Sequence, residues 1–186
     1  MITRRAIIAQ GAGIVLLGFI VGYAARAAVV GLWFAPGEEP EQAIVAEFAK
    51  AEKSINYQMY NFTSPEIGTA LIDARGRGVK VEIMLDHGAA QSPHCQADRC
   101  SKAGCKVWVD NKHPIAHNKV RIIDEDRVMG GSYNDSAQAH HNAENLVMED
   151  GAKTVAKYLD NYREHKSHSV PWDVWVKDQK KKAKAK

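Results

Sequence analysis

The side chains best suited to chemistry lie close together in the sequence, between residues 117 and 145. In a strand that begins near Asn118, residues 117 and 119 point to the same face, so the imidazole of His117 and the ammonium of Lys119 share it. An imidazole can act as a nucleophile, and an ammonium beside it can hold negative charge. The same stretch continues with Asp124, Gly130-Gly131-Ser132-Tyr133-Asn134 and Glu144-Asn145.

These neighbours predict a site for a phosphate group. Lys119 can hold a phosphate as a point charge, and Ser132 and Asn134, again at alternate positions, add neutral donors. The glycine pair at 130 and 131 lets the backbone approach a substrate closely. Glu144 is suited to accept the imidazole N–H and to leave the other ring nitrogen free for attack. Each residue alone has an ordinary structural explanation, and only their combination predicts a functional site.

The combination resembles the signature of the phospholipase D superfamily. That signature, the HKD motif, reads H-x-K-x4-D-x6-G-S-x-N and is matched at His117, Lys119, Asp124, Gly131, Ser132 and Asn134. Residues 60–67, 77–81 and 85–86 are similar to the first half of the small bacterial members. Within the family, the likeness is to the exported, EDTA-resistant endonuclease type with one motif per chain, and it covers roughly residues 29–166.

The resemblance implies a fold and an assembly. Members of the family fold as an α/β/α sandwich, and their active site uses two copies of the motif. Because this chain has one copy, the resemblance implies a homodimer in which two His117 side chains face each other across a shared site. One His117 would attack phosphorus to form a phosphohistidine, and the other would protonate the leaving oxygen.

The resemblance also implies roles for the other motif residues. Lys119 and Asn134 of both subunits would bind the nonbridging phosphate oxygens, with assistance from Ser132. Glu144 would orient the histidine. Asp124 and Gly131 are expected to support the loops of the motif. No metal and no cofactor are expected, because cations and hydrogen-bond donors stabilise the charge that a metal would otherwise neutralise.

Hydrophobic periodicity predicts an α/β fold from the residues themselves. Apolar and alternating runs predict strands at residues 29–34, 54–61, 79–86, 105–109, 119–124, 127–129 and 144–149. Helical spacing predicts helices at residues 41–54, 64–76 and 152–166, and a short helix within residues 87–104. This order indicates an α/β sandwich with a mostly parallel or mixed central sheet, and 186 residues suit one such domain.

The first 28 residues resemble a signal peptide or a membrane anchor. Arg4 and Arg5 precede an uncharged, mostly apolar run from Ala6 to Ala25, and Ala25-Arg26-Ala27 has the small-x-small pattern of a cleavage site. Cleavage predicts a periplasmic or secreted protein. Retention predicts a membrane-anchored protein that faces outward, with membrane association through the N-terminus. The phospholipase D-like domain is expected to span residues 29–170.

Charge is unevenly divided along the chain. The net charge is +3, of which residues 1–27 contribute +3 and residues 177–186 contribute +5, so the body carries −5. Bulk charge therefore does not indicate nucleic-acid binding, and a phosphate site must depend on local placement. Residues 171–186 are expected to form a basic, disordered tail with a salt-dependent attraction for nucleic acid or anionic lipid.

Three cysteines lie five residues apart, at Cys95, Cys100 and Cys105. In an exported protein their spacing predicts one disulfide, between Cys95 and Cys100 across a short loop. A zinc site that also uses His94 or His87 is the alternative.

Three further histidines, His113, His140 and His141, have no place in the motif. We expect them to be solvated or to face substrate rather than to bind a metal.

Three functions are compatible with these features. The leading hypothesis is an exported phosphodiesterase that hydrolyses DNA or RNA as a nonspecific endonuclease. The alternative is a phospholipase D-type lipid hydrolase acting on phosphatidyl headgroups or cardiolipin. The third is a noncatalytic, membrane-tethered binding protein, which the intact His117, Lys119, Asn134 and Glu144 argue against.

Overall fold

The computed structural model describes residues 29–185. Residues 1–28, where the signal peptide or anchor is predicted, lie outside the described part. The described elements, in chain order, are β1 (Val29–Ala35), α1 (Glu39–Lys50), β2 (Ser54–Met59), α2 (Pro65–Gly76), β3 (Lys80–Asp86), η1 (Ala89–Gln91), α3 (Ala97–Lys102), β4 (Lys106–Asp110), β5 (Lys119–Ile123), β6 (Arg127–Gly131), η2 (Ala137–His141), β7 (Glu144–Glu149), α4 (Ala152–His168), β8 (Val170–Pro171) and α5 (Trp172–Lys184).

The strands form one mixed sheet of eight strands in the order β1-β7-β6-β5-β2-β3-β4-β8. Strands β2, β3 and β4 are parallel to one another, and the other neighbours pair antiparallel. Crossover helices join the parallel strands, whereas a tight hairpin joins β5 and β6, as parallel and antiparallel connections require. The predicted mixed sheet is therefore confirmed.

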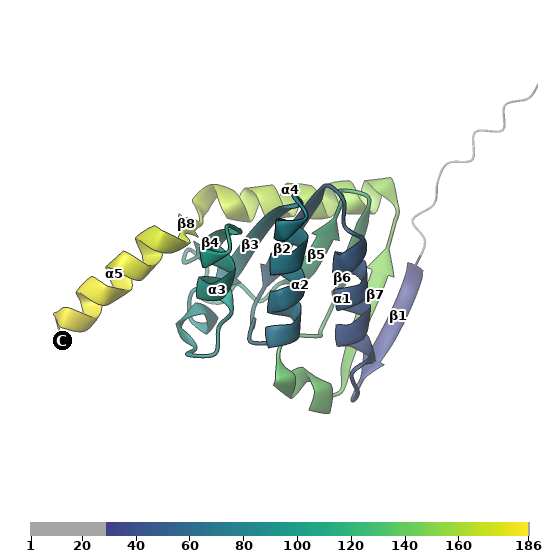
Figure 1. Ribbon diagram of the computed structural model, residues 1–186, viewed down its shortest axis with the longest axis horizontal. Helices are drawn as coiled ribbons and strands as arrows, with labels where there is room; N and C mark the ends of the chain where they lie inside the picture. Colours follow the sequence, from purple (N-terminus) through teal and green to yellow (C-terminus); the bar gives the residue numbers. More distant parts are fainter. Residues whose placement is uncertain (1–28, 186) are drawn as a thin grey trace, which may run out of the picture.

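Helices cover both faces of the sheet (Figure 1). Helices α1, α2 and α3 lie on one face, where Ile44, Phe48 and Leu71 pack with the sheet in the larger core. Helix α4 crosses the other face, where Val155 and Leu159 pack in a second core. The predicted α/β/α sandwich is confirmed, because a sheet buried on both faces needs a helical layer on each side.

Local sequence explains where α2 begins. Ser64 has an extended backbone, and its side-chain oxygen accepts a hydrogen bond from the backbone N–H of Ile67 at 3.1 Å. Pro65 follows at the first helical position, where a missing N–H costs nothing. The predicted start and end of this helix are both confirmed. Helix α1 is shorter than predicted, because it ends at Lys50 rather than at Ser54 and leaves residues 51–53 as the turn into β2.

The C-terminal segment corrects one prediction. Residues 171–186 were expected to be disordered, but Trp172–Lys184 form helix α5, which projects from the β4 end of the sheet (Figure 1). Trp175 is buried, and its ring stacks on Trp172 with centroids 5.1 Å apart. Trp172 and Trp175 are three residues apart, so they lie on the same face of a helix. Their burial stabilises the helix, and the high lysine content of the segment gave no indication of it.

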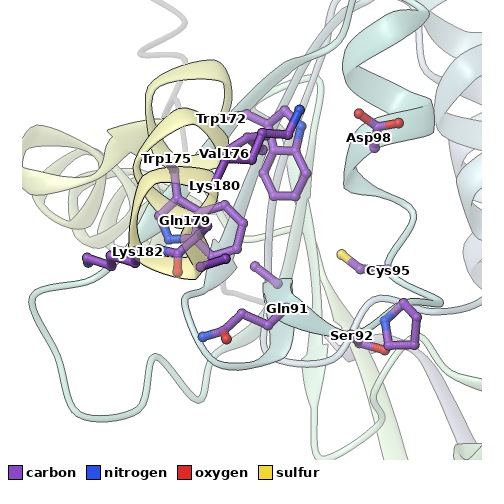
Figure 2. Close-up of a pocket in the computed structure, with 13 residues that line it drawn as sticks. Gln91, Ser92, Cys95, Asp98, Trp172, Trp175, Val176, Gln179, Lys180 and Lys182 are labelled. Atoms are coloured by element: carbon purple, nitrogen blue, oxygen red, sulfur yellow. The ribbon is translucent and has the colours of Figure 1, made fainter. Parts of the chain in front are cut away.

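Helix α5 and the segment before α3 enclose a pocket of about 540 Å³ (Figure 2). Trp172 and Trp175 line it from α5, and Cys95 lines it from the opposite wall. None of the predicted catalytic residues lines this pocket. No helix within residues 29–185 has the length and apolar character needed to cross a membrane.

The cysteines differ from the expected pairing, because Cys95, Cys100 and Cys105 are all free thiols in the structure. Cys100 is buried on α3, and a hydrogen bond with Cys105, together with burial, raises the pKa of its thiol. Cys95 instead lies at the pocket beside α5. Cys100 therefore faces Cys105 rather than Cys95, because the helix turns its side chain into the core.

Candidate active site

The predicted catalytic residues meet at one edge of the sheet. The carboxyl ends of parallel β2, β3 and β4 lie at this edge, and antiparallel β5 starts there with Lys119. Strand β7, which runs in the same direction as β5, also starts there, with Glu144. In open α/β sheets, the edge outside the carboxyl ends of the strands is the usual place for a ligand.

His117 and Lys119 form a contact pair. His117 is exposed and lies just before β5, whereas the side chain of Lys119 is buried, so that the residue is only 6% exposed. The Lys119 Nζ lies 3.2 Å from each ring nitrogen of His117 and donates to the His117 carbonyl at 2.9 Å. The predicted sharing of one face is confirmed, although His117 precedes the strand. The pair offers a solvent-facing imidazole backed by a buried cation.

Two residues outside the motif, Tyr60 and Asp86, position this pair. The Tyr60 ring lies against the His117 ring, with centroids 4.6 Å apart, and Lys119 Nζ lies 5.2 Å from the Tyr60 centroid. The buried Asp86 carboxylate accepts the backbone N–H of Ala116 at 2.9 Å. Tyr60 directly follows buried strand β2, and Asp86 is the last residue of buried strand β3. These positions in the sequence indicate that both residues lie at this edge of the sheet.

Burial lowers the pKa of Lys119, and the nearby Arg121 lowers it further, while Glu144 opposes the shift. Desolvation destabilises the charged form of an amine, and a second cation has the same effect. A phosphate bound beside Lys119 would restore the lost stabilisation of its charge. The site is therefore built to gain from binding an anion.

The loop after β6 carries Ser132 and Asn134 and is fixed to Asn145. The Asn145 carbonyl accepts the N–H of Ser132 at 3.1 Å, and the Asn145 N–H donates to Ser132 Oγ at 3.0 Å. Gly131 has φ +147°, and a Cβ there would lie 2.3 Å from the Asn145 carbonyl oxygen. Only glycine allows this approach, which accords with the supporting role predicted for Gly131.

Asn134 and Glu144 complete the edge. The Asn134 Oδ1 is buried and has no hydrogen-bond partner among residues 29–185. Glu144 accepts a hydrogen bond from Asn142 at 3.1 Å and is close enough to Lys119 to influence its charge. In the single chain, the ring contacts of His117 are made by Lys119 and Tyr60. The orienting role of Glu144 therefore stays a prediction.

Asp124 lies at the other end of β5 and has a structural environment. Its carboxylate accepts the backbone N–H groups of Glu52, Lys53 and Ser54, with the shortest bond at 2.7 Å. Burial alone would raise the pKa of Asp124, but these hydrogen bonds outweigh it and lower the pKa. The Asp of the motif thus fixes the turn before β2, away from the imidazole.

A buried ion pair connects the two halves of the motif. Arg121 and Asp135 are both fully buried and form a salt bridge, and Arg121 also donates to the Tyr133 carbonyl at 3.1 Å. Tyr57 donates to Asp135 at 2.7 Å. Arg121 is on β5 beyond Lys119, and Asp135 directly follows Asn134. Sequence reasoning missed this pair because only the fold brings residues 121 and 135 together.

The remaining histidines divide into different environments. His141 is exposed, as expected. His140 is not freely solvated, since its Nε2 lies 3.1 Å from Glu41 and its ring stacks on Tyr133.

His113 is not freely solvated as expected. Its Nδ1 contacts the buried Asp110 at 2.9 Å, in a cluster with two histidines of α4.

The alternative zinc site is predicted to use His87 or His94 with the cysteines. Within residues 29–185, these residues do not form a group compact enough to bind a metal.

This fold and site define a phosphodiesterase of the phospholipase D type. The sequence profile of the family described as "Cardiolipin synthase, PLD-like domain" matches residues 44–166. A phospholipase D of Rickettsia prowazekii is 38% identical over 137 residues, which is 73% of this chain and 67% of the relative. The chain therefore belongs to the phospholipase D superfamily.

Two further similar proteins show how varied the members of this superfamily are. Human mitochondrial cardiolipin hydrolase is 27% identical over 127 residues, 68% of this chain and 50% of the human protein. The crystal structure of Nuc, a phospholipase D family member from Salmonella typhimurium, superposes with a TM-score of 0.74 at 26% identity. That alignment covers 79% of this chain and 99% of Nuc. The described fold therefore contains nearly all of the Nuc fold.

Proposed function

We propose that this protein is an exported, nonspecific endonuclease that cleaves DNA or RNA through a phosphohistidine. The observation that carries the proposal is the His117–Lys119 contact pair at an open sheet edge, in a chain whose fold covers nearly all of Nuc. An open edge admits a long polymer, and Lys119 and the Ser132–Asn134 loop offer groups that bind one phosphate without reading bases.

A homodimer would complete the site. The chain has one HKD motif, and His117 is exposed on the surface of the single chain. Two large apolar side chains flank this edge: Ile115 is 59% exposed, and Phe34, which pairs with Asn145 in the sheet, is 60% exposed. A dimer through this edge would bury both apolar side chains.

In this dimer, one imidazole acts as nucleophile and the other as acid and then base. A ring nitrogen of His117 attacks phosphorus, forming the N–P bond as the P–O bond to the leaving group breaks. His117 of the partner subunit gives its proton to that oxygen. It then takes a proton from water, which attacks phosphorus and breaks the N–P bond. Lys119 and Asn134 stabilise the charge on the nonbridging oxygens in both steps.

Export is part of the proposal. Arg4 and Arg5 followed by an uncharged run, with the Ala25-Arg26-Ala27 pattern, support a periplasmic or secreted enzyme. Its check is the N-terminal sequence of the protein recovered from the periplasm or medium. A mature chain that starts near residue 28 supports cleavage, and an intact N-terminus in the membrane fraction supports the outward-facing anchor.

A lipid hydrolase is the second candidate. The relatives named phospholipase D and cardiolipin hydrolase favour it, and the same histidine chemistry cleaves a lipid phosphodiester. The basic helix α5, which carries five lysines between Lys177 and Lys184, suits an anionic membrane surface as well as a polynucleotide.

A substrate panel separates the two. Single-stranded DNA, duplex DNA, RNA and cardiolipin vesicles are incubated with wild type, with His117→Ala and with the exposed-histidine control His141→Ala. We expect cleavage of nucleic acid, full activity in the control, and loss in His117→Ala with the dimer intact by light scattering. Turnover of cardiolipin but not of nucleic acid would overturn the endonuclease proposal, and full activity in His117→Ala would overturn the mechanism.

A chelator tests metal independence at the same site. We expect the initial rate to persist in EDTA, because the donors around His117 supply the charge stabilisation. Circular dichroism recorded on the same sample shows whether the protein is still folded. Loss of activity in chelated protein that keeps its folded spectrum would contradict metal-independent cleavage.

A further inference from the structure

A second cluster of side chains lies outside the candidate active site, at the end of β4. Asp110, the last residue of β4, is fully buried. Three imidazoles surround its Oδ2: His113 Nδ1 at 2.9 Å, His165 Nδ1 at 3.2 Å and His168 Nε2 at 3.3 Å. These four ligand atoms all lie within 4.8 Å of one another.

Hydrogen bonds orient the Asp110 carboxylate for this role. Its Oδ1 accepts the backbone N–H groups of Lys112 at 3.0 Å and of His113 at 3.4 Å. The same oxygen therefore cannot turn toward the imidazoles, and Oδ2 faces them alone. Metal sites commonly fix a ligating group through such outer hydrogen bonds.

Hydrogen bonding alone does not account for the cluster. Three imidazole nitrogens converge on Asp110 Oδ2, and a carboxylate oxygen has only two lone pairs. The side chains of His165 and His168 are only 17% and 16% exposed, so water does not readily solvate the surplus donor. A cation at the centre would be attracted by the carboxylate and would accept a lone pair from each neutral imidazole.

The ligand types and spacing fit zinc. Structural zinc is four-coordinate and tetrahedral, with bonds of about 2.0–2.1 Å to imidazole nitrogen and carboxylate oxygen, which places neighbouring ligand atoms about 3.4 Å apart. The contacts of 2.9 to 3.3 Å around Asp110 are close to that spacing. We propose that Asp110, His113, His165 and His168 bind one Zn²⁺ ion in a closed, structural site.

The site joins distant parts of the chain. Asp110 and His113 flank the turn after β4, while His165 and His168 lie one helical turn apart in the last turn of α4. The ion thereby fastens the end of α4 to the sheet edge, immediately before β8 and α5. It also anchors the start of the segment that runs from residue 113 to His117.

The zinc site is separate from the candidate catalytic centre. Strand β4 is three positions from β5 in the sheet, which corresponds to about 14 Å at the usual strand spacing. The ion therefore does not contact a phosphate held by Lys119. Its removal is expected to affect unfolding temperature and not the chemistry at His117.

The test uses the full chain without an affinity tag. Metal is removed by prolonged dialysis against a chelator, and Zn²⁺ is then titrated with calorimetry and a final metal analysis. Wild type is expected to bind one Zn²⁺ per chain, and its unfolding temperature is expected to rise on binding. His113→Gln and His168→Gln, which keep a polar side chain of moderate size, are expected to bind at least about 100-fold more weakly, since loss of even an outer hydrogen bond costs 10- to 100-fold.

His141→Gln is the matched control, because His141 is exposed and outside the cluster. It is expected to bind Zn²⁺ like wild type. Replacement of zinc by Co²⁺ supplies a second measurement on wild type alone, which is expected to show the visible absorption of a tetrahedral cobalt site. Equal zinc binding by His168→Gln and His141→Gln would overturn the proposal, and so would wild type that takes up no Zn²⁺ and shows no cobalt spectrum.

Discussion

Arg121 and Asp135 form a fully buried salt bridge between the strand that carries Lys119 and the loop that carries Asn134. The two catalytic candidates thus share one rigid support, although 15 positions separate Lys119 and Asn134 in the sequence. A buried pair of this kind tolerates the loss of one partner poorly, because the other charge is left uncompensated.

Replacement of Asp135 tests this support. Asp135→Asn is expected to lower the free energy of unfolding by about 3–5 kcal/mol, the usual cost of an unpaired buried charge. Urea unfolding followed by circular dichroism measures it. The control is Asp126→Asn, whose exposed carboxylate pairs with Arg127 at the surface; its effect is expected to stay below about 1 kcal/mol. A similar small loss for both variants would contradict a supporting role for the pair.

Lys119 is expected to set the alkaline limit of activity. Burial lowers its pKa from the ordinary value of 10.5, so the ammonium proposed to bind phosphate is present at low pH and lost as pH rises through the lowered pKa. Lys119→Arg keeps the charge at high pH and is expected to shift the alkaline limb of the rate profile upward. Lys112→Arg, on an exposed lysine, is the control. An unchanged limb in Lys119→Arg would assign the titration to another group.

Lys119→Met is expected to lower kcat by about 10²–10³, the range for loss of one donor that stabilises a developing charge. The folded state should be retained, because the change removes a buried cation and keeps a side chain of similar length. Steady-state kinetics and thermal unfolding of the same preparation separate the two effects. A variant that loses stability and activity in proportion would indicate a structural role for Lys119.

Gly131 is expected to tolerate no side chain. Gly131→Ala forces a Cβ to within 2.3 Å of the Asn145 carbonyl oxygen, at a φ that alanine avoids. The expected loss is about 1–3 kcal/mol in unfolding free energy, together with a lower kcat because Ser132 and Asn134 move. Gly76→Ala serves as the control, since a Cβ there meets nothing within 4 Å. Wild-type kinetics in Gly131→Ala would show that the loop need not approach Asn145 so closely.

Asp124 is expected to make stability depend on pH in the acid range. Its folded-state pKa lies below the ordinary 3.8, so its contribution is complete above about pH 5 and is lost as pH falls through the folded pKa. Asp124→Asn should therefore be less stable than wild type at pH 7, by about 2 kcal/mol for hydrogen bonds to a charged group. Unfolding at pH 7 and at pH 3 measures whether the gap narrows. A gap that is the same at both pH values would contradict this assignment.

The sequence alone determined most of the secondary-structure elements and the local pairing of the candidate catalytic residues. The strands and helix α2 could be predicted because their signals are local. These signals are the alternation of apolar residues along residues 79–86 and 119–129 and the Ser64-Pro65 start of α2. The HKD spacing likewise predicts the pairing of His117 with Lys119, because two residues apart on an extended backbone is a local relationship.

Tertiary structure decided the features that depend on distant residues. Asp110 meets His165 and His168, and Arg121 meets Asp135, only because the sheet order and the path of α4 bring them together. Helix α5 likewise depends on a tertiary contact, because Trp175 is buried where this helix packs beside β4. The lysine-rich composition of the segment does not predict that contact. Local spacing determines which secondary structure each segment can form. The burial of charged and apolar side chains between segments determines which tertiary contacts it makes.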